Sequence, residues 1–234
     1  MCGKAEIRAR VWDRLESEGI ARFPFPPHGR ITNFDGAAEA ADRAMALPEL
    51  DGPAAVKANP DAPQLPLRRR LLKNGTTLYM AVPRLSEETC FVELDPEELS
   101  DLDAAPTVSH MGNYGTRVGP DALPEIDAIV VGSVAVGESG VRIGKGEGYS
   151  DLEFGVLREF GLVDDDTPTV TTVHDAQIVD ETVEPDRHDV PIDIVCTPTR
   201  TLRTDAGAKP TGIYRSALSE SRRAEIPVLD RLLG

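Results

Sequence analysis

Short apolar runs that alternate with helix-like stretches constrain the fold of this 234-residue chain more than any other feature of its sequence. The run from Ile126 to Val131 is almost entirely apolar, which is typical of a strand buried on both faces of a sheet. Ala54–Ala58, Thr169–Val173 and Ile192–Val195 are also expected to be buried strands. Helices that alternate with such strands indicate an α/β layered sandwich, with a largely parallel central sheet flanked by helices.

The spacing of apolar residues predicts the helices between these runs. Apolar side chains recur at four-residue steps from Ile7 to Leu15 within a stretch from Lys4 to Glu18, and Gly19 is its expected stop. Further helices are expected at Gly36–Leu47 (with Asp35 as its cap), Leu65–Leu72, Leu152–Phe160 and Ser216–Ala224. We also expect strands at Thr76–Val82 and Cys90–Leu94, an extension of the central run at Val134–Val136, a helical turn at Pro96–Leu102 and a loop at Ser109–Arg117.

The length fits one domain over residues 1–234, large enough to bury a core. No stretch is long and apolar enough to cross a bilayer, and no signal peptide precedes the first helix. We therefore expect a cytoplasmic protein without a membrane partner, as a monomer or a homodimer. The three cysteines are scattered and lack the spacing of a metal site. We expect them to be reduced thiols: Cys2, Cys90 and Cys196.

The net charge of −15 comes from acidic residues that are dispersed along the chain. Two interpretations stay open, an acidic face that binds a partner and an adaptation to concentrated salt, in which charges are screened. Scarce lysine favours the second interpretation. Either way, a negative surface argues against nonspecific nucleic-acid binding, which needs cations that face phosphates.

The glycine-rich segment from Gly144 to Asp151 is the strongest candidate for a functional site. Glycines at positions 144, 146 and 148 allow positive φ angles, so that consecutive N–H groups can form a nest for anionic oxygens. Lys145 adds a positive charge, and the helix expected after the segment adds its N-terminal dipole. The spacing fits neither a Walker loop nor a dinucleotide fingerprint, and a flexible turn between strand and helix is the simpler alternative.

Four segments together resemble the 5-formyltetrahydrofolate cyclo-ligase (methenyltetrahydrofolate synthetase) family. Residues 142–151, RIGKGEGYSD, are similar to its signature R-x-G-x-G-x-G-Y-Y-D. Residues 4–8, KAEIR, resemble its opening K-x-x-(L/I)-R, in which the two cations share one helix face. Pro83-Arg84 and the segment His188–Asp193 resemble two later family elements. The resemblance spans nearly the whole chain and is greatest to the methenyltetrahydrofolate synthase domain-containing branch, although the RNA-recognition module of some animal members is not expected here.

The sequence also departs from the family pattern at three places. Ser150 stands where the signature has its second tyrosine, and Gly132-Ser133 replaces the usual proline-glycine before the loop. The folate-contacting segment with its glutamate has no clear counterpart; residues 59–63, NPDAP, occupy its place, and Asp61 is the candidate substitute.

The resemblance implies an enzyme that uses ATP and Mg²⁺ to convert 5-formyltetrahydrofolate to 5,10-methenyltetrahydrofolate, through phosphorylation of the formyl oxygen. It implies a catalytic role for Lys145 and Tyr149, and magnesium binding by Asp151 and Asp189. The implied ATP-binding residues are Lys4, Arg8, Arg142, Gly144, Lys145, Gly146, Glu147, Gly148, Tyr149 and Ser150. The folate-type substrate would contact Lys145, Gly146, Glu147, Gly148, Tyr149 and Asp61.

Two other functions stay open because of the departures: an ATP-dependent enzyme for a different small substrate, and a nucleotide- or folate-binding protein without catalysis. Other polar residues have alternatives too. His174-Asp175 could be a catalytic pair but more simply caps the end of a strand, with Asp175 bonding nearby backbone. His110 and Tyr114 could line a folate cleft or lie on the surface, and His28 and Trp12 are expected to be structural.

Overall fold

The computed structural model describes residues 3–181 and 183–233. Its centre is an eight-stranded sheet in the order β13-β12-β10-β7-β3-β4-β5-β6. The strands are β3 (Ala55–Ala58), β4 (Thr77–Ala81), β5 (Phe91–Leu94), β6 (Thr116–Val118), β7 (Ala128–Val130), β10 (Thr169–Thr172), β12 (Ile194–Cys196) and β13 (Thr201–Arg203). Strands β12, β10, β7, β3 and β4 are parallel to one another, and β13, β5 and β6 pair antiparallel at the two edges. The expected largely parallel sheet is therefore confirmed for its centre.

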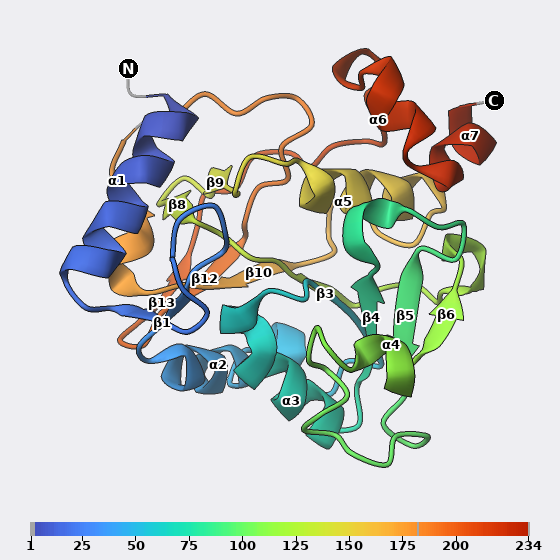
Figure 1. The fold of residues 1–234 in the computed structure, drawn as a ribbon, viewed down its shortest axis with the longest axis horizontal. Coiled ribbons are helices and arrows are strands. Elements are labelled where there is room, and N and C mark those ends of the chain that lie inside the picture. Colours follow the sequence, from blue (N-terminus) through green and yellow to red (C-terminus); the bar gives the residue numbers. More distant parts are fainter. Residues whose placement is uncertain (1–2, 182, 234) are drawn as a thin grey trace.

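Helices cover both faces of this sheet, as the layered sandwich requires (Figure 1). Helices α2 (Ala37–Met45) and α3 (Leu65–Lys73) lie on one side, and α5 (Tyr149–Glu159) lies on the other. Every residue of β3, β7, β10 and β12 is buried, because the central strands are covered on both faces. Asp35 does not cap α2; Gly36, at φ 83°, occupies the cap position without a side-chain hydrogen bond.

A second, smaller sheet explains how the N-terminal helix reaches the glycine-rich segment. It has the order β11-β8-β9, from Ile178–Val179, Ala135–Gly137 and Arg142–Ile143. The predicted extension of the central strand at Val134–Val136 is therefore wrong, because this stretch leaves the main sheet to pair with β9 and β11. Helix α1 (Lys4–Ser17) buries Ile7, Val11 and Leu15 in a separate apolar cluster with residues of this small sheet.

Several peripheral elements also differ from the expectation. Residues 96–102 form turns rather than helix, and the predicted loop at 109–117 contains α4 (Met111–Tyr114) and part of β6. A two-stranded sheet, β1 (Ala21–Arg22) with β2 (Asn33–Phe34), follows α1. The helix expected at Ser216–Ala224 is shorter, α6 (Glu220–Ala224), and the sequence did not predict α7 (Pro227–Leu233). Among the helices of the described residues, none is long and apolar enough to cross a membrane.

Candidate functional site

One cavity of about 670 Å³ collects the site residues that the sequence suggested from distant parts of the chain. It lies where the N-terminus of α1, the loop between β9 and α5, and the segment after β3 come together. Its lining includes Lys4, Arg8, Asp61, Arg142, Gly144, Lys145, Gly146, Glu147, Gly148, Tyr149, Ser150, Asp151 and Asp189. The expected residues are thus brought together; their roles stay predictions.

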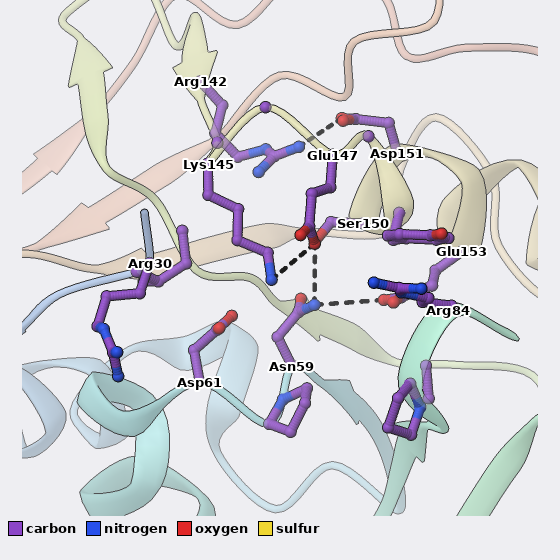
Figure 2. A pocket seen from close by; sticks show the side chains of 18 of the residues that line it. Arg30, Asn59, Asp61, Arg84, Arg142, Lys145, Glu147, Ser150, Asp151 and Glu153 are labelled. Carbon is purple, nitrogen blue, oxygen red and sulfur yellow. Dashed lines mark hydrogen bonds and ion pairs between the residues drawn. The ribbon is translucent and has the colours of Figure 1, made fainter. Parts of the chain in front are cut away.

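The glycine-rich loop has the backbone conformation that its sequence predicted at two of its three glycines. Gly146 has φ 104° and Gly148 has φ 71°, a region that side-chain-bearing residues rarely adopt. Gly148 is the N-cap residue of α5, so the loop ends directly at the helix N-terminus. Residues 145–148 are exposed, and Lys145 Nζ forms a 2.7 Å ion pair with Glu147. The loop therefore brings the N-terminus of α5 and the Lys145 side chain to the cavity (Figure 2).

Arg142 supports this loop from beneath. Its buried guanidinium donates to Asp151 Oδ1 at 2.6 Å and to the Gly132 carbonyl at 3.2 Å. Burial disfavours the charge, but the ion pair with Asp151 outweighs it and raises the pKa of Arg142. A Cβ at Gly144 would lie 2.8 Å from Arg142 Nη1, so a side chain there would displace the guanidinium of Arg142. The guanidinium of Arg142 is thus paired with Asp151 at the end of the loop, and its expected contact with ATP stays a prediction.

The first helix contributes two more cations. Arg8 Nε donates to the Gly144 carbonyl at 2.6 Å, and burial lowers the pKa of Arg8. Lys4 Nζ donates to Asp186 at 2.8 Å and also contacts Asp189. Burial disfavours the charge of Lys4, yet both carboxylates together raise its pKa. The helix spacing therefore places both cations at the cavity, as expected for positions i and i+4. Of the hydrogen bonds that the two side chains form with the described residues, only that of Arg8 reaches the loop.

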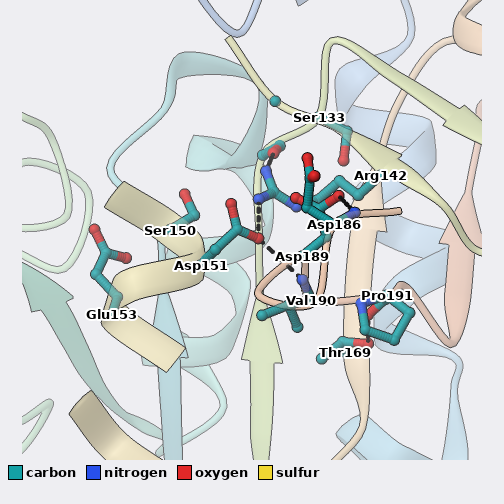
Figure 3. A network of polar contacts seen from close by, with 12 residues as sticks. Ser133, Arg142, Ser150, Asp151, Glu153, Thr169, Asp186, Asp189, Val190 and Pro191 are labelled. Atoms are coloured by element: carbon teal, nitrogen blue, oxygen red, sulfur yellow. Dashed lines mark hydrogen bonds and ion pairs between the residues drawn. The ribbon is translucent and has the colours of Figure 1, made fainter. Parts of the chain in front are cut away.

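Carboxylates suitable for a divalent cation stand beside these cations. Ligand atoms of Asp186, His188 and Asp189 lie within 4.8 Å of one another. Asp151 is not in this group; in the described part of the chain its hydrogen bonds use Oδ1, which accepts from Arg142 and from the Val190 N–H at 3.0 Å (Figure 3). The second contact ties Asp151 to the residue directly after Asp189.

A buried polar network that the sequence did not suggest forms the floor of the cavity. Lys57 and Glu153 are an ion pair with side chains only 1% and 7% exposed. Lys57 also donates to Asn59 Oδ1 at 3.2 Å, and Asn59 Nδ2 donates to Ser150 Oγ at 3.0 Å (Figure 2). Ser150, where the family signature has tyrosine, is therefore held by Asn59, which replaces part of the expected folate-contacting segment.

Arg68 fixes the same replaced segment from below. Its buried guanidinium donates to three successive carbonyls, those of Asn59, Pro60 and Asp61, and to a fourth at Pro106. Burial lowers the pKa of Arg68 to about 9. Asp61 then points into the cavity, where burial raises the pKa of its carboxyl group. A Cβ at position 132 would lie 2.5 Å from Asp61 Oδ2, which explains why glycine stands there.

The sequence analysis did not name Arg68 or Lys57 as site residues, although the sequence indicates that both side chains are buried. Arg68 precedes Leu71 and Leu72 by three and four positions, so it shares the apolar face of its helix. Lys57 stands inside a buried strand in a chain with few lysines. A cation placed on a buried face needs partners, and both residues have them.

The remaining candidates lie outside this cavity. His174 caps a short turn, accepting a hydrogen bond from the Ala176 N–H at 3.1 Å, as the simpler interpretation required. Asp175 binds the hydroxyl groups of Thr197 and Thr199 rather than backbone. His110 and Tyr114 do not line the cavity. His28 contacts Asp13 at 2.8 Å, and Trp12 packs on the small core; both have the structural roles expected for them.

Comparison of the sequence with known protein families identifies the family of this chain. The sequence model of the 5-formyltetrahydrofolate cyclo-ligase family matches residues 4–198. The chain belongs to this family.

Its relatives include methenyltetrahydrofolate synthase domain-containing proteins. The Mus musculus protein is 43% identical over 235 residues, and the Homo sapiens protein is 39% identical over 236 residues. Each alignment covers 98% of this chain but only 63% and 61% of the relative, respectively, so the chain spans less than two thirds of these proteins. The NMR structure of Aquifex aeolicus 5,10-methenyltetrahydrofolate synthetase matches 88% of this chain and 95% of its own, with a TM-score of 0.53 and 20% identity. This likeness shows the shared fold.

Proposed function

We propose that this protein converts 5-formyltetrahydrofolate to 5,10-methenyltetrahydrofolate with ATP and magnesium. The observation that carries the proposal is the convergence of Lys4, Arg8 and Lys145 with the glycine-rich loop on one cavity, in a member of the cyclo-ligase family. A helix N-terminus and three cations lie at the cavity, and the glycine-rich backbone allows a nest of N–H groups; together these suit a triphosphate.

The proposed reaction has two steps. The formyl oxygen attacks the γ-phosphorus of ATP, a P–O bond forms, and ADP leaves. N10 then attacks the activated carbon, its proton is lost, and the C–O bond breaks to release phosphate. Catalysis of phosphoryl transfer rests mainly on positioning and charge neutralisation, which this cavity can supply.

Each loop residue has a part in this scheme. Lys145, now paired with Glu147, turns toward the phosphates and neutralises the transferred group. Arg8 fixes the loop through Gly144 and adds positive charge at the phosphates. Glu147, Gly148 and Tyr149 lie at the junction between nucleotide and folate, and Asp61 faces the substrate from the cavity floor.

The residues beside Lys4 fit a magnesium ion. Mg²⁺ prefers one or two carboxylates together with phosphate oxygens and water, and Asp189 lies at the cavity with a second carboxylate, Asp186, next to it. Asp189 would hold the ion, and Asp151 would act through the oxygen that Arg142 leaves free or by fixing the chain at Val190. Bound magnesium supplies charge neutralisation to the phosphate oxygens.

The deciding experiment mixes the protein with MgATP and 5-formyltetrahydrofolate and follows the absorbance of the methenyl product. We expect a rise that requires both substrates, with one ADP released per product. The assay is run at low salt and at molar potassium chloride, because the dispersed acidic surface suits concentrated salt. Folded protein without turnover at either salt would refute the proposal.

One observation favours a different substrate as the second candidate. Arg68 fixes the Asn59–Asp61 segment in place of the family's folate-contacting segment. In that case ADP release would depend on another small molecule, and folates would not stimulate it. ATP binding without any turnover would instead indicate a non-catalytic member.

A further inference from the structure

The glycine-rich loop separates two cavities rather than lining one. A second cavity of about 300 Å³ shares Gly146, Glu147, Gly148 and Asp151 with the larger one. Most of its other lining comes from the C-terminal segment: Gly212, Ile213, Tyr214, Ala217, Leu218, Ser219 and Arg222. The back of the loop therefore faces a part of the chain beyond residues 4–198, which the family model matches.

Arg222, on α6, is the residue of this segment that binds the loop. Its Nη2 donates a 2.7 Å hydrogen bond to the Glu147 carbonyl. Its guanidinium carbon lies 4.3 Å from the centre of the Tyr149 ring, within the range of a cation–π contact. Arg222 is absent from the described residues that line the larger cavity, so it acts on the loop from behind.

The segment that carries Arg222 is firmly attached to the domain. Ile226, Val228 and Leu229 are fully buried in the main core. The Ile213 N–H donates to Glu159 on α5 at 2.9 Å. Ser219 caps α6 by accepting a hydrogen bond from the Arg222 N–H at 3.2 Å. In Figure 1 the red helices α6 and α7 lie beside α5, so Arg222 extends from a fixed base.

Arg142 fixes the end of this loop at Asp151, so the exposed residues between Gly144 and Tyr149 depend on other contacts. Residues 145–148 are exposed, and Gly146 and Gly148 give the backbone more conformational freedom than any other residue. Two arginines bind its carbonyls, Arg8 at Gly144 from the cavity side and Arg222 at Glu147 from the back. The stretch between these carbonyls contains Lys145 and Gly146, whose N–H groups face the nucleotide in the proposed function.

We propose that Arg222 is a positioning residue for the nucleotide, and that the C-terminal segment is thereby part of the ATP site. Arg222 fixes the Glu147 carbonyl and the Tyr149 ring, and so orders the loop before the phosphates arrive, without touching them. An ordered loop loses less conformational entropy on binding, which increases affinity. This inference rests on the proposed use of ATP and adds to it a residue outside the matched part of the family.

The test compares Arg222→Ala, Arg222→Lys and Arg223→Ala in the full chain. Arg223 is the matched control because it lies on the same helix but donates to the Arg215 carbonyl, away from the loop. Affinity for a non-hydrolysable ATP analogue with Mg²⁺ is measured by calorimetry, hydrogen exchange is followed over residues 144–151, and thermal unfolding gives stability.

We expect Arg222→Ala to weaken analogue binding about tenfold, because a loop without its contacts at Glu147 and Tyr149 must be ordered when the analogue binds. Exchange in the loop should accelerate, the KM for ATP should rise more than kcat falls, and Arg222→Lys should restore part of the affinity. Arg223→Ala should change only stability.

Three outcomes separate the explanations. Unchanged affinity and exchange in Arg222→Ala would overturn the positioning role while leaving the proposed function intact. If Arg222→Ala and Arg223→Ala lose the same affinity for the ATP analogue, Arg222 only stabilises the fold and has no positioning role. A wild-type protein that binds no ATP analogue would instead refute the proposed use of ATP, and the positioning role with it.

Discussion

Asn59 Nδ2 donates a 3.0 Å hydrogen bond to Ser150 Oγ, which joins two of the places where this chain departs from its family's pattern. Asn59 follows β3, and Ser150 lies in the first turn of α5. The same amide group contacts Glu153 Oε2 at 3.3 Å. The departures are therefore coupled: a small hydroxyl side chain at position 150 leaves room for Asn59 on the cavity floor.

This coupling predicts the effect of changing Ser150. Ser150→Ala should lower the free energy of unfolding by about 1 kcal/mol, because the Asn59 amide loses one of its partners. Ser150→Tyr should be more harmful, since a ring cannot fit within hydrogen-bonding distance of Asn59 without displacing it. Urea denaturation measures both, with Ser17→Ala as an exposed control. If Ser150→Tyr is as stable as the wild type, the coupling is wrong.

The buried ion pair beneath Asn59 predicts a larger effect. Lys57→Met should lower the free energy of unfolding by roughly 3–5 kcal/mol, because it leaves the Glu153 carboxylate buried without its partner. The double variant Lys57→Met/Glu153→Gln should recover a substantial part of this loss. Chemical denaturation of the single and double variants gives the coupling energy. Strictly additive losses would show that the two side chains do not stabilise each other.

Sequence patterns predicted the parts of the fold that depend on local periodicity and burial. Strands β7, β10 and β12 are buried on both faces, and their sequences are rich enough in apolar or β-branched residues to be recognised singly. Helix α1 was predicted because its buried residues repeat at four-residue steps. The glycine-rich loop was predicted as an anion site from its glycines and Lys145. The resemblance to the family signature then indicated Lys4 and Arg8 on α1 as further residues of the site.

Features that depend on distant partners could not be predicted in this way. Strand β9 has two residues, too few for a pattern, and it exists because Ala135 and Val136 pair with it. The helical spacing of Arg68 indicates that it shares the buried face of α3, but it does not indicate which distant carbonyls accept its hydrogen bonds. Arg222 lies 75 residues from Glu147, and nothing local to either residue signals their contact.

Asp61 predicts a pH-dependent change in stability. Burial raises the pKa of this carboxyl group above its ordinary value of 3.8, so the folded chain binds the proton more tightly than the unfolded chain. Its contribution to the free energy of unfolding is therefore full below pH 3.8 and declines as the pH rises through the raised pKa. At pH 7 the partly buried, ionised carboxylate therefore lowers stability, and Asp61→Asn removes this effect.

Thermal unfolding of Asp61→Asn and wild type across pH 4 to 7 checks this expectation. The variant should be more stable near pH 7, and the difference should shrink toward pH 4, where the native carboxyl holds its proton. The exposed Asp51→Asn serves as the control for removing one negative charge. A variant less stable than wild type at pH 7 would mean that attraction by Lys145 and Arg68 outweighs the burial of Asp61.

Lys145 provides the most direct test of the phosphate loop. Its Nζ is paired only with the exposed Glu147 among the described residues, at 2.7 Å, so its removal costs little stability. Lys145→Ala should nevertheless weaken binding of MgATP about 10- to 100-fold, because hydrogen bonds to charged groups contribute about 1.5–3 kcal/mol each. Lys73→Ala is the matched control, since Lys73 forms a similar exposed pair with Asp103 at 2.7 Å, away from the cavity. Calorimetric titration measures the affinity of both variants for MgATP. Normal binding by Lys145→Ala would exclude the loop as the phosphate site. Weaker binding by Lys145→Ala alone would identify the loop as that site.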